Sequence, residues 1–359
     1  MKPSSRQICF FLAAVAPVGK LVLMPAQLAA DAGNDLLFPV LAQLVLQAAL
    51  IFCVLLLARH DCTVFALVRR AAGDVAARIF AVLLAAFLLF FAFLPVVEQK
   101  ITVRSIFYDT IPAHLVFAPF FLFSAYLSAR ALGSLGRVWD ILAPLSAVGM
   151  AGVLLLSVGN ADFGALAPFG AAGTGGFVDG IRRTCCWFCD SALLLAMIGH
   201  FPYRKGLAWK GTLCYLGGGL VLLFFLAVFY GVFGEIAVLQ TPAFARVSAF
   251  FSAATVLGRI DYLFIFALAF VMTFYVVLPV QEAVGTLAEA FGGASLLPPL
   301  LSVGCNALLF AAVSLLDLSP SQTISAITGT LFWIFPLFSA ALPFVLLALF
   351  GRRQREKIS

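Results

Sequence analysis

Long apolar runs separated by short polar connections cover almost the whole chain. A run of about 20 apolar residues is long enough to cross the hydrocarbon core of a bilayer as a helix. About ten such runs are present, and no connection between them is long enough to form a soluble domain. The runs lie at residues 8–29, 36–58, 79–97, 112–132, 138–158, 178–201, 211–234, 258–281, 295–316 and 324–350. The pattern predicts an all-α polytopic membrane protein, with residues 1–359 as a single transmembrane domain.

Composition agrees with this prediction. Hydrophobic residues make up 64% of the chain and charged residues 11%, whereas soluble domains contain about 45–50% apolar and about 25% charged residues. The net charge of +6 comes without a basic stripe with interleaved aromatic residues, the pattern typical of nucleic-acid binding. We therefore expect the chain to lie in a lipid bilayer and to bind no nucleic acid.

The placement of lysine and arginine predicts the orientation. If the N-terminus is cytoplasmic, most loop lysines and arginines fall on the inner side, which is the usual bias. An even number of spans then places both termini in the cytoplasm. Residues 59–78 on the inside and 242–257 on the outside resemble short helices that lie on a membrane surface. The first run loosely resembles a signal peptide, but it is too long and a lysine interrupts it, so we expect it to be retained.

Lys20 lies near the middle of the first run, directly after Pro17, Val18 and Gly19. A charge at the centre of a bilayer costs roughly 2.5–3.5 kcal/mol on the mild insertion scale. Proline and glycine weaken the helical hydrogen bonds beside it. A broken transmembrane helix with a charge is typical of binding or coupling sites in transporters. The alternative is a lysine that reaches toward the surface or pairs structurally with a carboxylate.

The sixth run has a second interruption. A glycine-rich stretch at 170–180 leads through Cys185, Cys186 and Trp187 to Asp190, and an unbroken apolar run begins only at Ala192. This predicts a second broken helix with an acidic residue near the break. The first and sixth runs are five apart, which favours two five-helix halves in inverted orientation. Asp190 has an alternative role as the N-cap of a helix that starts at Ser191.

Other polar groups have simpler interpretations. Cys186 and Cys189 have the spacing of a metal or redox pair, but a zinc site needs about four ligands, and no second pair or nearby histidine supplies them. We expect no metal and no cofactor. No nucleophile–histidine–acid set or phosphate-binding loop is present, so the chain is not predicted to be an enzyme.

Charged residues at helix ends predict structural contacts. The pairs are Arg137 with Asp140, which have i,i+3 spacing and can meet on one helix face, and Arg259 with Asp261. Glu98, at the outer end of the third run, is expected to be solvated.

Several stretches spread over nearly the whole length carry a family resemblance. The apolar part of the first run ends at Pro25, shortly after the break at Gly19, and Asp190 lies where the related sequences carry a glutamate. The further stretches are Arg130–Pro144, Leu166–Gly170, and Thr241-Pro242 followed by Gly258-Arg259-Ile260-Asp261. In order and spacing they resemble the spore germination permease family, the B subunits of nutrient germinant receptors in the amino acid–polyamine–organocation superfamily.

The resemblance implies a ten-helix, leucine-transporter-like fold in the spore inner membrane. It also implies a small nutrient ligand, with a larger A-type subunit and a lipoprotein C-type subunit as partners. In such a fold the first and sixth helices adjoin, so Lys20 and Asp190 are expected to form a buried ion pair that the amine and carboxylate of a ligand compete for. The candidate ligand-binding residues are Pro17, Val18, Gly19, Lys20, Phe188, Cys189, Asp190 and Ser191.

The chain departs from the family pattern at three positions. Lys20 stands where the family usually has a small or apolar residue, Asp190 replaces glutamate, and Gly258 replaces an acidic residue. These differences argue against a shared ligand and leave the predicted fold unchanged. The leading functional hypothesis is a germinant-receptor subunit that binds a small amino-acid-like molecule in a permease-type pocket. The alternatives are a proton-coupled amino-acid transporter of the same superfamily and a structural subunit whose ligand pocket has decayed.

Overall fold

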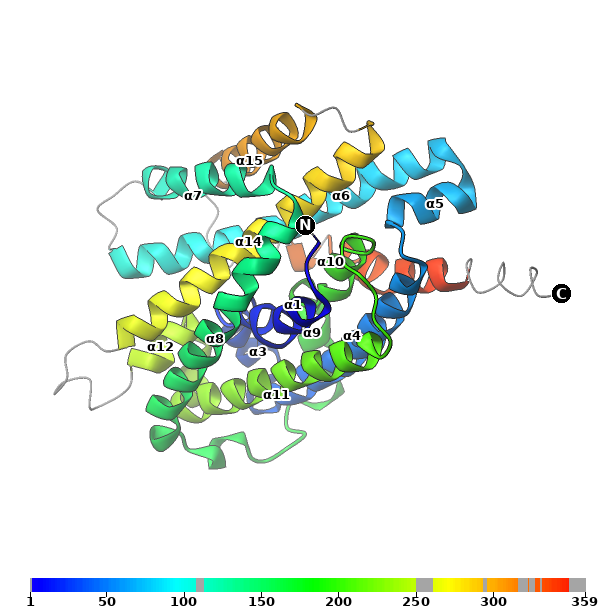
Figure 1. The fold of residues 1–359 in the computed structure, drawn as a ribbon. Helices are drawn as coiled ribbons and strands as arrows, with labels where there is room; N and C mark the ends of the chain where they lie inside the picture. The colour runs from blue at the N-terminus through cyan, green and yellow to red at the C-terminus, as the bar shows by residue number, and fades with distance from the viewer. Residues whose placement is uncertain are drawn as a thin grey trace.

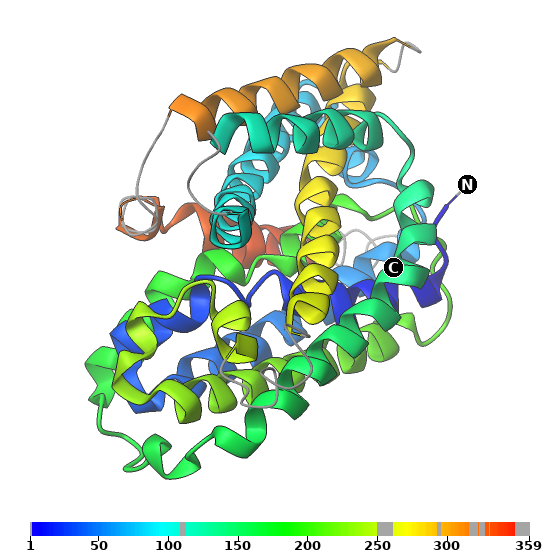
Figure 2. The same ribbon diagram turned by 90° about the vertical axis from the view of Figure 1, so that its left-hand side faces the viewer.

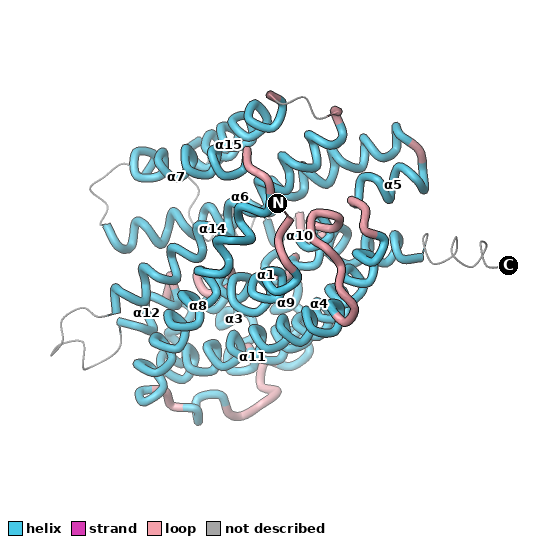
Figure 3. The backbone as a smooth tube through the Cα atoms, viewed as in Figure 1, coloured by secondary structure: helices cyan, strands magenta, loops and turns pink. Residues whose placement is uncertain are grey.

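The computed structural model describes residues 2–107, 113–249, 261–292, 296–315, 322, 327–329 and 331–348. Every regular element within these ranges is a helix (Figure 3). The longer elements are α4 (Leu37–Leu57), α6 (Asp74–Phe107), α7 (Ala113–Ser128), α8 (Leu132–Ser157), α11 (Leu207–Phe233), α14 (Asp261–Ala290) and α15 (Leu297–Leu315). The shorter ones are α1 (Ser5–Phe10), α2 (Ala16–Val18), α3 (Met24–Ala32), α5 (Val64–Ala72), α9 (Gly173–Thr184), α10 (Asp190–Ala196), α12 (Ala243–Ala249) and α17 (Ile334–Pro336).

Six of the described helices are long and apolar enough to cross a membrane. They are Leu37–His60, Asp74–Val103, Leu132–Asn160, Leu207–Leu239, Tyr262–Ala290 and Leu297–Ser314. Shorter apolar helices cover Ser5–Val18, Ala118–Ser128 and Ile334–Ala348. The chain is therefore an integral, multi-pass membrane protein, as its apolar pattern predicts. The count of ten spans stays a prediction.

The two interrupted runs lie in the interior of the molecule. All side chains from Val15 to Ala26 are buried, and so are all side chains of α10. In Figure 1 the first helix and α10 lie among α4, α6, α8, α11 and α14. Burial of the apolar side chains in these two segments stabilises the bundle. Any polar group that they carry must find a partner inside the protein.

The surrounding helices pack in pairs. α4 packs against α11, α6 against α14, and α7 against α15. Figure 2 shows α7 and α15 as a layer on one side of α6 and α14, away from α11. In the order of the predicted spans, these pairs join the second run to the seventh, the third to the eighth and the fourth to the ninth.

Glycine lets α11 approach the first helix closely. A Cβ atom on Gly218 would overlap the main-chain oxygen of Ala13, and one on Gly219 would lie 2.7 Å from Leu44 Cδ2. A Cβ on the neighbouring Gly217 would meet no atom within 4 Å. Gly218 therefore lets the backbone of α11 pack against the helix that carries the first break, and Gly219 lets it pack against α4.

Both predicted surface segments contain a helix. α5 lies within residues 59–78 and buries Val64, Phe65 and Leu67 on one face. α12 covers Ala243–Ala249, and residues 250–257 lie outside the described part of the chain. Their position on a membrane surface stays a prediction.

The ion pairs at helix ends differ from the prediction. Asp140 pairs with Arg6 at 3.0 Å and also accepts a hydrogen bond from Gln7 Nε2 at 2.7 Å. The sequence predicted Arg137 as its partner, because spacing along one helix shows only local neighbours. Arg6 comes instead from α1, which packs against the start of α8. The predicted pair of Arg259 with Asp261 cannot be compared with the structure, because Arg259 and the side chain of Asp261 lie outside its described part.

Candidate ligand site at two helix breaks

The first helix loses its regular hydrogen bonds over one turn before Lys20. Residues Phe11–Val15 form a π-helical turn, and α2 ends at Val18. Pro17 has no N–H to donate to an oxygen one turn earlier, so main-chain oxygens in this turn need other donors. The Ser146 hydroxyl donates to Ala14 O at 2.7 Å, and the Lys20 ammonium donates to Ala16 O at 3.1 Å.

A short irregular segment joins α2 to α3. Its main-chain oxygens at Leu21 and Val22 accept hydrogen bonds from the N–H groups of Phe244 and Ala243, at the start of α12. Lys20 N donates to Pro17 O at 3.0 Å. Irregular backbone inside a membrane protein has to be satisfied by other protein groups. The break is therefore fixed by α12 and by the turn itself.

The second break separates α9 from α10 and is held by a glutamine of α4. Gln47 Nε2 donates to Phe188 O at 2.6 Å, and Gln47 Oε1 accepts from Ser191 N at 3.3 Å. Gln43, one turn earlier, donates to Thr184 Oγ1 at 2.6 Å. Ser191 Oγ donates to Ser339 O at 2.7 Å, which ties the start of α10 to a second π-helical turn at Leu337–Ala341.

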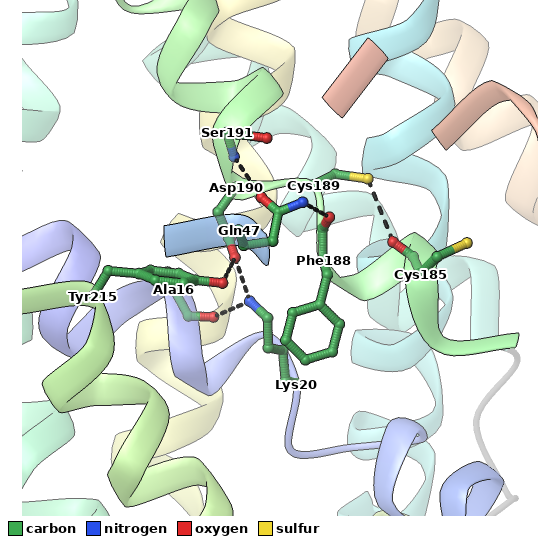
Figure 4. Close-up of polar contacts among 9 residues, drawn as sticks. All are labelled: Ala16, Lys20, Gln47, Cys185, Phe188, Cys189, Asp190, Ser191 and Tyr215. Atoms are coloured by element: carbon green, nitrogen blue, oxygen red, sulfur yellow. Dashed lines mark hydrogen bonds and ion pairs between the residues drawn. The ribbon is translucent and has the colours of Figure 1, made fainter. Parts of the chain in front are cut away.

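Lys20 and Asp190 form an ion pair where the two breaks meet. The Lys20 Nζ atom is 2.8 Å from Asp190 Oδ2, and the side chains are 1% and 0% exposed (Figure 4). The Tyr215 hydroxyl donates to the same carboxylate oxygen at 3.0 Å. The ammonium also lies 5.3 Å from the centre of the Phe188 ring, within cation–π distance.

This geometry decides between the alternatives left open by the sequence. The predicted pair of Lys20 with Asp190 is present, and the lysine does not reach a surface because it is buried. Asp190 is not the N-cap of α10, since Cys189 precedes the helix and makes no side-chain capping bond. The Asp190 carboxylate instead points to the first break, where it neutralises the lysine.

Glu98 of α6 joins both breaks from a third side. Its Oε1 atom accepts hydrogen bonds from Leu23 N at 3.2 Å and from Trp187 Nε1 at 2.9 Å. Leu23 immediately precedes α3, whose N-terminus favours a negative charge. Glu98 also interacts electrostatically with Lys20, and the Tyr275 hydroxyl interacts with both Glu98 and Asp190. Three ionisable side chains thus belong to one buried cluster.

The prediction that Glu98 is solvated is wrong. The apolar run ends at residue 97, but α6 continues to Phe107, so Glu98 lies inside the helix with an exposed fraction of 0%. Gln43, Gln47 and Tyr215 were also missed. A polar pair one helical turn apart in an apolar run was the available signal for Gln43 and Gln47; Tyr215 gave none, because aromatic residues are frequent throughout the chain.

Three of the eight predicted ligand-binding residues meet in the cluster. These are Lys20, Phe188 and Asp190, whereas Cys189 Sγ points away toward Cys185 O. Gly19 lies directly against the ring of Tyr275. Pro17 and Val18 face a separate apolar cavity of about 270 Å³ between α8 and α11. Ser191 bonds to Gln47 and to Ser339.

The cysteines take no part in the charge cluster. Cys185, Cys186 and Cys189 are free thiols, and no group of three potential metal ligands occurs in the described ranges. The polar atoms in the cluster are ammonium, carboxylate, phenol and amide groups. Such groups bind small charged molecules by ion pairs and hydrogen bonds.

The comparison with known families decides the identity. The model of a family described as spore germination protein matches residues 4–315, which is most of the chain. The chain belongs to the spore germination permease family. A comparison with curated proteins gives no match.

The family match contains the whole charge cluster. Lys20, Glu98 and Asp190 all lie within residues 4–315, as do α4 and α11. The described helix Ile334–Ala348 lies after the matched region. In this spore germination permease, therefore, both breaks lie within the region that the family model matches, whereas the π-helical turn at Leu337–Ala341 lies after it.

Proposed function

We propose that this chain is the membrane subunit of a spore nutrient-germinant receptor and that a small amino-acid-like germinant binds at the junction of the two broken helices. The observation that carries the proposal is the fully buried Lys20–Asp190 ion pair at that junction. Such a pair is costly to bury and is weak evidence for stability alone. Its position between two broken helices favours a role in binding.

The chemistry of the pair matches both ends of an amino acid. A ligand carboxylate replaces Asp190 as the partner of the Lys20 ammonium, and a ligand ammonium replaces Lys20 as the partner of Asp190. The Tyr215 hydroxyl holds Asp190 in place, while the Phe188 ring lies beside the lysine. Binding therefore exchanges one ion pair for two, and it separates the helix that carries Lys20 from the helix that carries Asp190.

The arrangement of helices supports a ten-span, leucine-transporter-like architecture. The second, third and fourth predicted runs pack against the seventh, eighth and ninth, as expected from two inverted five-helix halves. With ten spans, both termini lie in the cytoplasm. We propose the spore inner membrane as the location of the receptor, as the family suggests, and A-type and C-type subunits as the partners that convert separation of the breaks into a germination signal.

Germination of spores that lack this chain tests the proposal directly. Each of the twenty amino acids is supplied in turn to wild-type and deletion spores, and loss of refractility is followed. The deletion is expected to abolish the response to at least one amino acid, and restoring the chain is expected to recover it. Unchanged responses to all twenty would contradict the proposal.

A proton-coupled amino-acid transporter is the second candidate. Glu98 favours it, because buried carboxylates inside a membrane protein commonly carry protons along transport pathways. Membrane vesicles that contain the chain should then accumulate labelled amino acids when a proton gradient is imposed, and should lose this uptake when the gradient is collapsed. A receptor that does not transport shows binding without gradient-dependent uptake.

A further inference from the structure

The buried cluster contains two carboxyl groups and one ammonium group. Lys20 and Asp190 neutralise one another at 2.8 Å. Glu98 adds the second carboxyl group, which interacts electrostatically with Lys20 but forms no ion pair among the described residues. A buried carboxyl group without a cationic partner is neutralised by a proton. A positively charged ligand that replaces this proton would pair with Glu98.

Two carboxylate oxygens of this cluster lack hydrogen-bond donors. Glu98 Oε2 and Asp190 Oδ1 are both buried and have no partner in the part of the chain that the structure describes. The other oxygen of each group is well supplied: Glu98 Oε1 has two donors, and Asp190 Oδ2 has the Lys20 ammonium and the Tyr215 hydroxyl. Buried acceptors are normally satisfied, and the Tyr275 hydroxyl already interacts with Asp190, so Glu98 Oε2 is the position that a donor of the ligand would fill.

We infer that the site selects a ligand with two cationic groups and one carboxylate, which is the chemistry of a basic amino acid. This rests on the proposed function and narrows its ligand class. The ligand carboxylate pairs with Lys20, its α-ammonium with Asp190, and its side-chain cation with Glu98. The ligand then brings a net charge of one positive unit to a cluster of one cation and two carboxylates, and the sum is neutral.

Glu98 sets this selectivity, because it supplies a second carboxyl group for the side-chain cation of the ligand, from a helix separate from the Lys20–Asp190 pair. Its Oε1 bonds to Leu23 and Trp187 hold the carboxylate against both breaks while Oε2 remains available. A neutral amino acid satisfies the pair but offers no cation to Glu98, which then keeps its proton. Such a ligand is expected to bind at least about tenfold more weakly, since a charge-assisted hydrogen bond is lost.

Matched ligands test this inference on the full-length protein in lipid nanodiscs. The probes are lysine with its neutral analogue norleucine, and arginine with its neutral analogue citrulline, each titrated while thermal unfolding is recorded. A ligand that binds the folded state raises Tm with concentration. We expect the cationic member of each pair to bind at least about tenfold more tightly. Equal or tighter binding of the neutral members would overturn the inference.

Variants of Glu98 locate the effect. Glu98→Gln keeps the acceptor for Leu23 and Trp187 but removes the charge, so the preference for the cationic member is expected to fall to about equal binding. Glu98→Asp keeps the charge and is expected to retain the preference. The matched control is Glu282→Gln, which neutralises another buried glutamate, in α14, and is expected to bind like the wild type. An unchanged preference in Glu98→Gln would contradict the assignment.

The binding measurements also distinguish a failure of this inference from a failure of the proposed function. If neutral amino acids bind and basic ones do not, the charge argument fails while an amino-acid site remains. If none of the twenty amino acids binds, both fail. If Glu98→Gln does not fold, the ratio measured on the wild-type protein and on Glu98→Asp still decides the question.

Discussion

At the scale of single residues, Asp190 is the carboxylate of the buried ion pair. It accepts from Lys20 and Tyr215, and neither group bonds to another carboxylate in the described part of the chain. Removing one partner of a buried ion pair leaves the other charged and desolvated, which costs much more than replacing both partners by apolar residues. The high cost of removing a single partner therefore distinguishes this buried pair from an ion pair on the protein surface.

Asp190→Asn is therefore expected to destabilise the protein by about 3–5 kcal/mol. Lys20→Met together with Asp190→Leu is expected to recover most of that loss, because the double variant removes both charges of the pair together. Thermal unfolding of the detergent-purified variants measures both effects. A double variant that is as unstable as the sum of its two single variants would contradict a direct pair.

The Tyr215 hydroxyl is expected to contribute less. Tyr215→Phe removes one hydrogen bond to a charged acceptor and should destabilise the protein by about 1.5–3 kcal/mol. Tyr230→Phe is the matched control, because it removes a hydroxyl from the same helix at a position that contacts neither break. Chemical denaturation in detergent compares the two. If both substitutions have the same effect, the hydroxyl of Tyr215 does not support Asp190.

At the scale of elements, the position of the first break depends on close contact with α11. Gly218→Ala places a Cβ atom on the Ala13 carbonyl oxygen, which is main chain and cannot move without shifting the π-helical turn. We expect a loss of about 1–3 kcal/mol, in the range of an overpacked core. Gly217→Ala meets no atom and should be neutral or slightly stabilising, because alanine favours helix. Similar unfolding of the two variants would contradict this packing.

Sequence and structure agree where apolar length or a helix-breaking pattern carries the information. The long helices follow from runs such as 36–58 and 211–234, and both breaks follow from Pro17-Val18-Gly19 and from the polar stretch before Ala192. The rest depends on three-dimensional neighbours. Glu98 was placed at a helix end because the apolar run stops at 97, and nothing local shows that α6 continues into the interior.

Contacts between residues that are far apart in the chain could not be predicted from the sequence pattern either. The Arg6 partner of Asp140 is 134 residues away in the chain, and the bond from Gln47 to Phe188 spans 141. Periodicity and spacing describe one helix at a time, so they identified Arg137 as the nearest cation and gave no partner for Gln47. The pairing of Lys20 with Asp190 could be predicted because both lie at breaks in runs five apart, and the fold implied by the family resemblance places those two runs side by side.

At the scale of the whole molecule, the membrane topology follows from the proposed span count. Ten spans would place both termini on one side of the membrane, and the lysine and arginine bias predicts that this side is the cytoplasm. Reporters fused after residue 2 and after residue 359 are expected to show cytoplasmic activity, whereas a reporter inserted at Gly170, in a connection predicted to be outside, is expected to show the opposite location. Termini on opposite sides would require an odd number of spans and would contradict the ten-helix architecture.

The central claim is that the Lys20–Asp190 junction binds the germinant and is not only a structural contact. The most direct measurement is germination of spores carrying Lys20→Met with Asp190→Leu, tested with each of the twenty amino acids at wild-type levels of the protein. Because this double variant removes both charges together, we expect it to fold and to reach the membrane. We predict that its spores respond to none of the amino acids that depend on this chain. A wild-type response would show that the pair is structural and would contradict the claim.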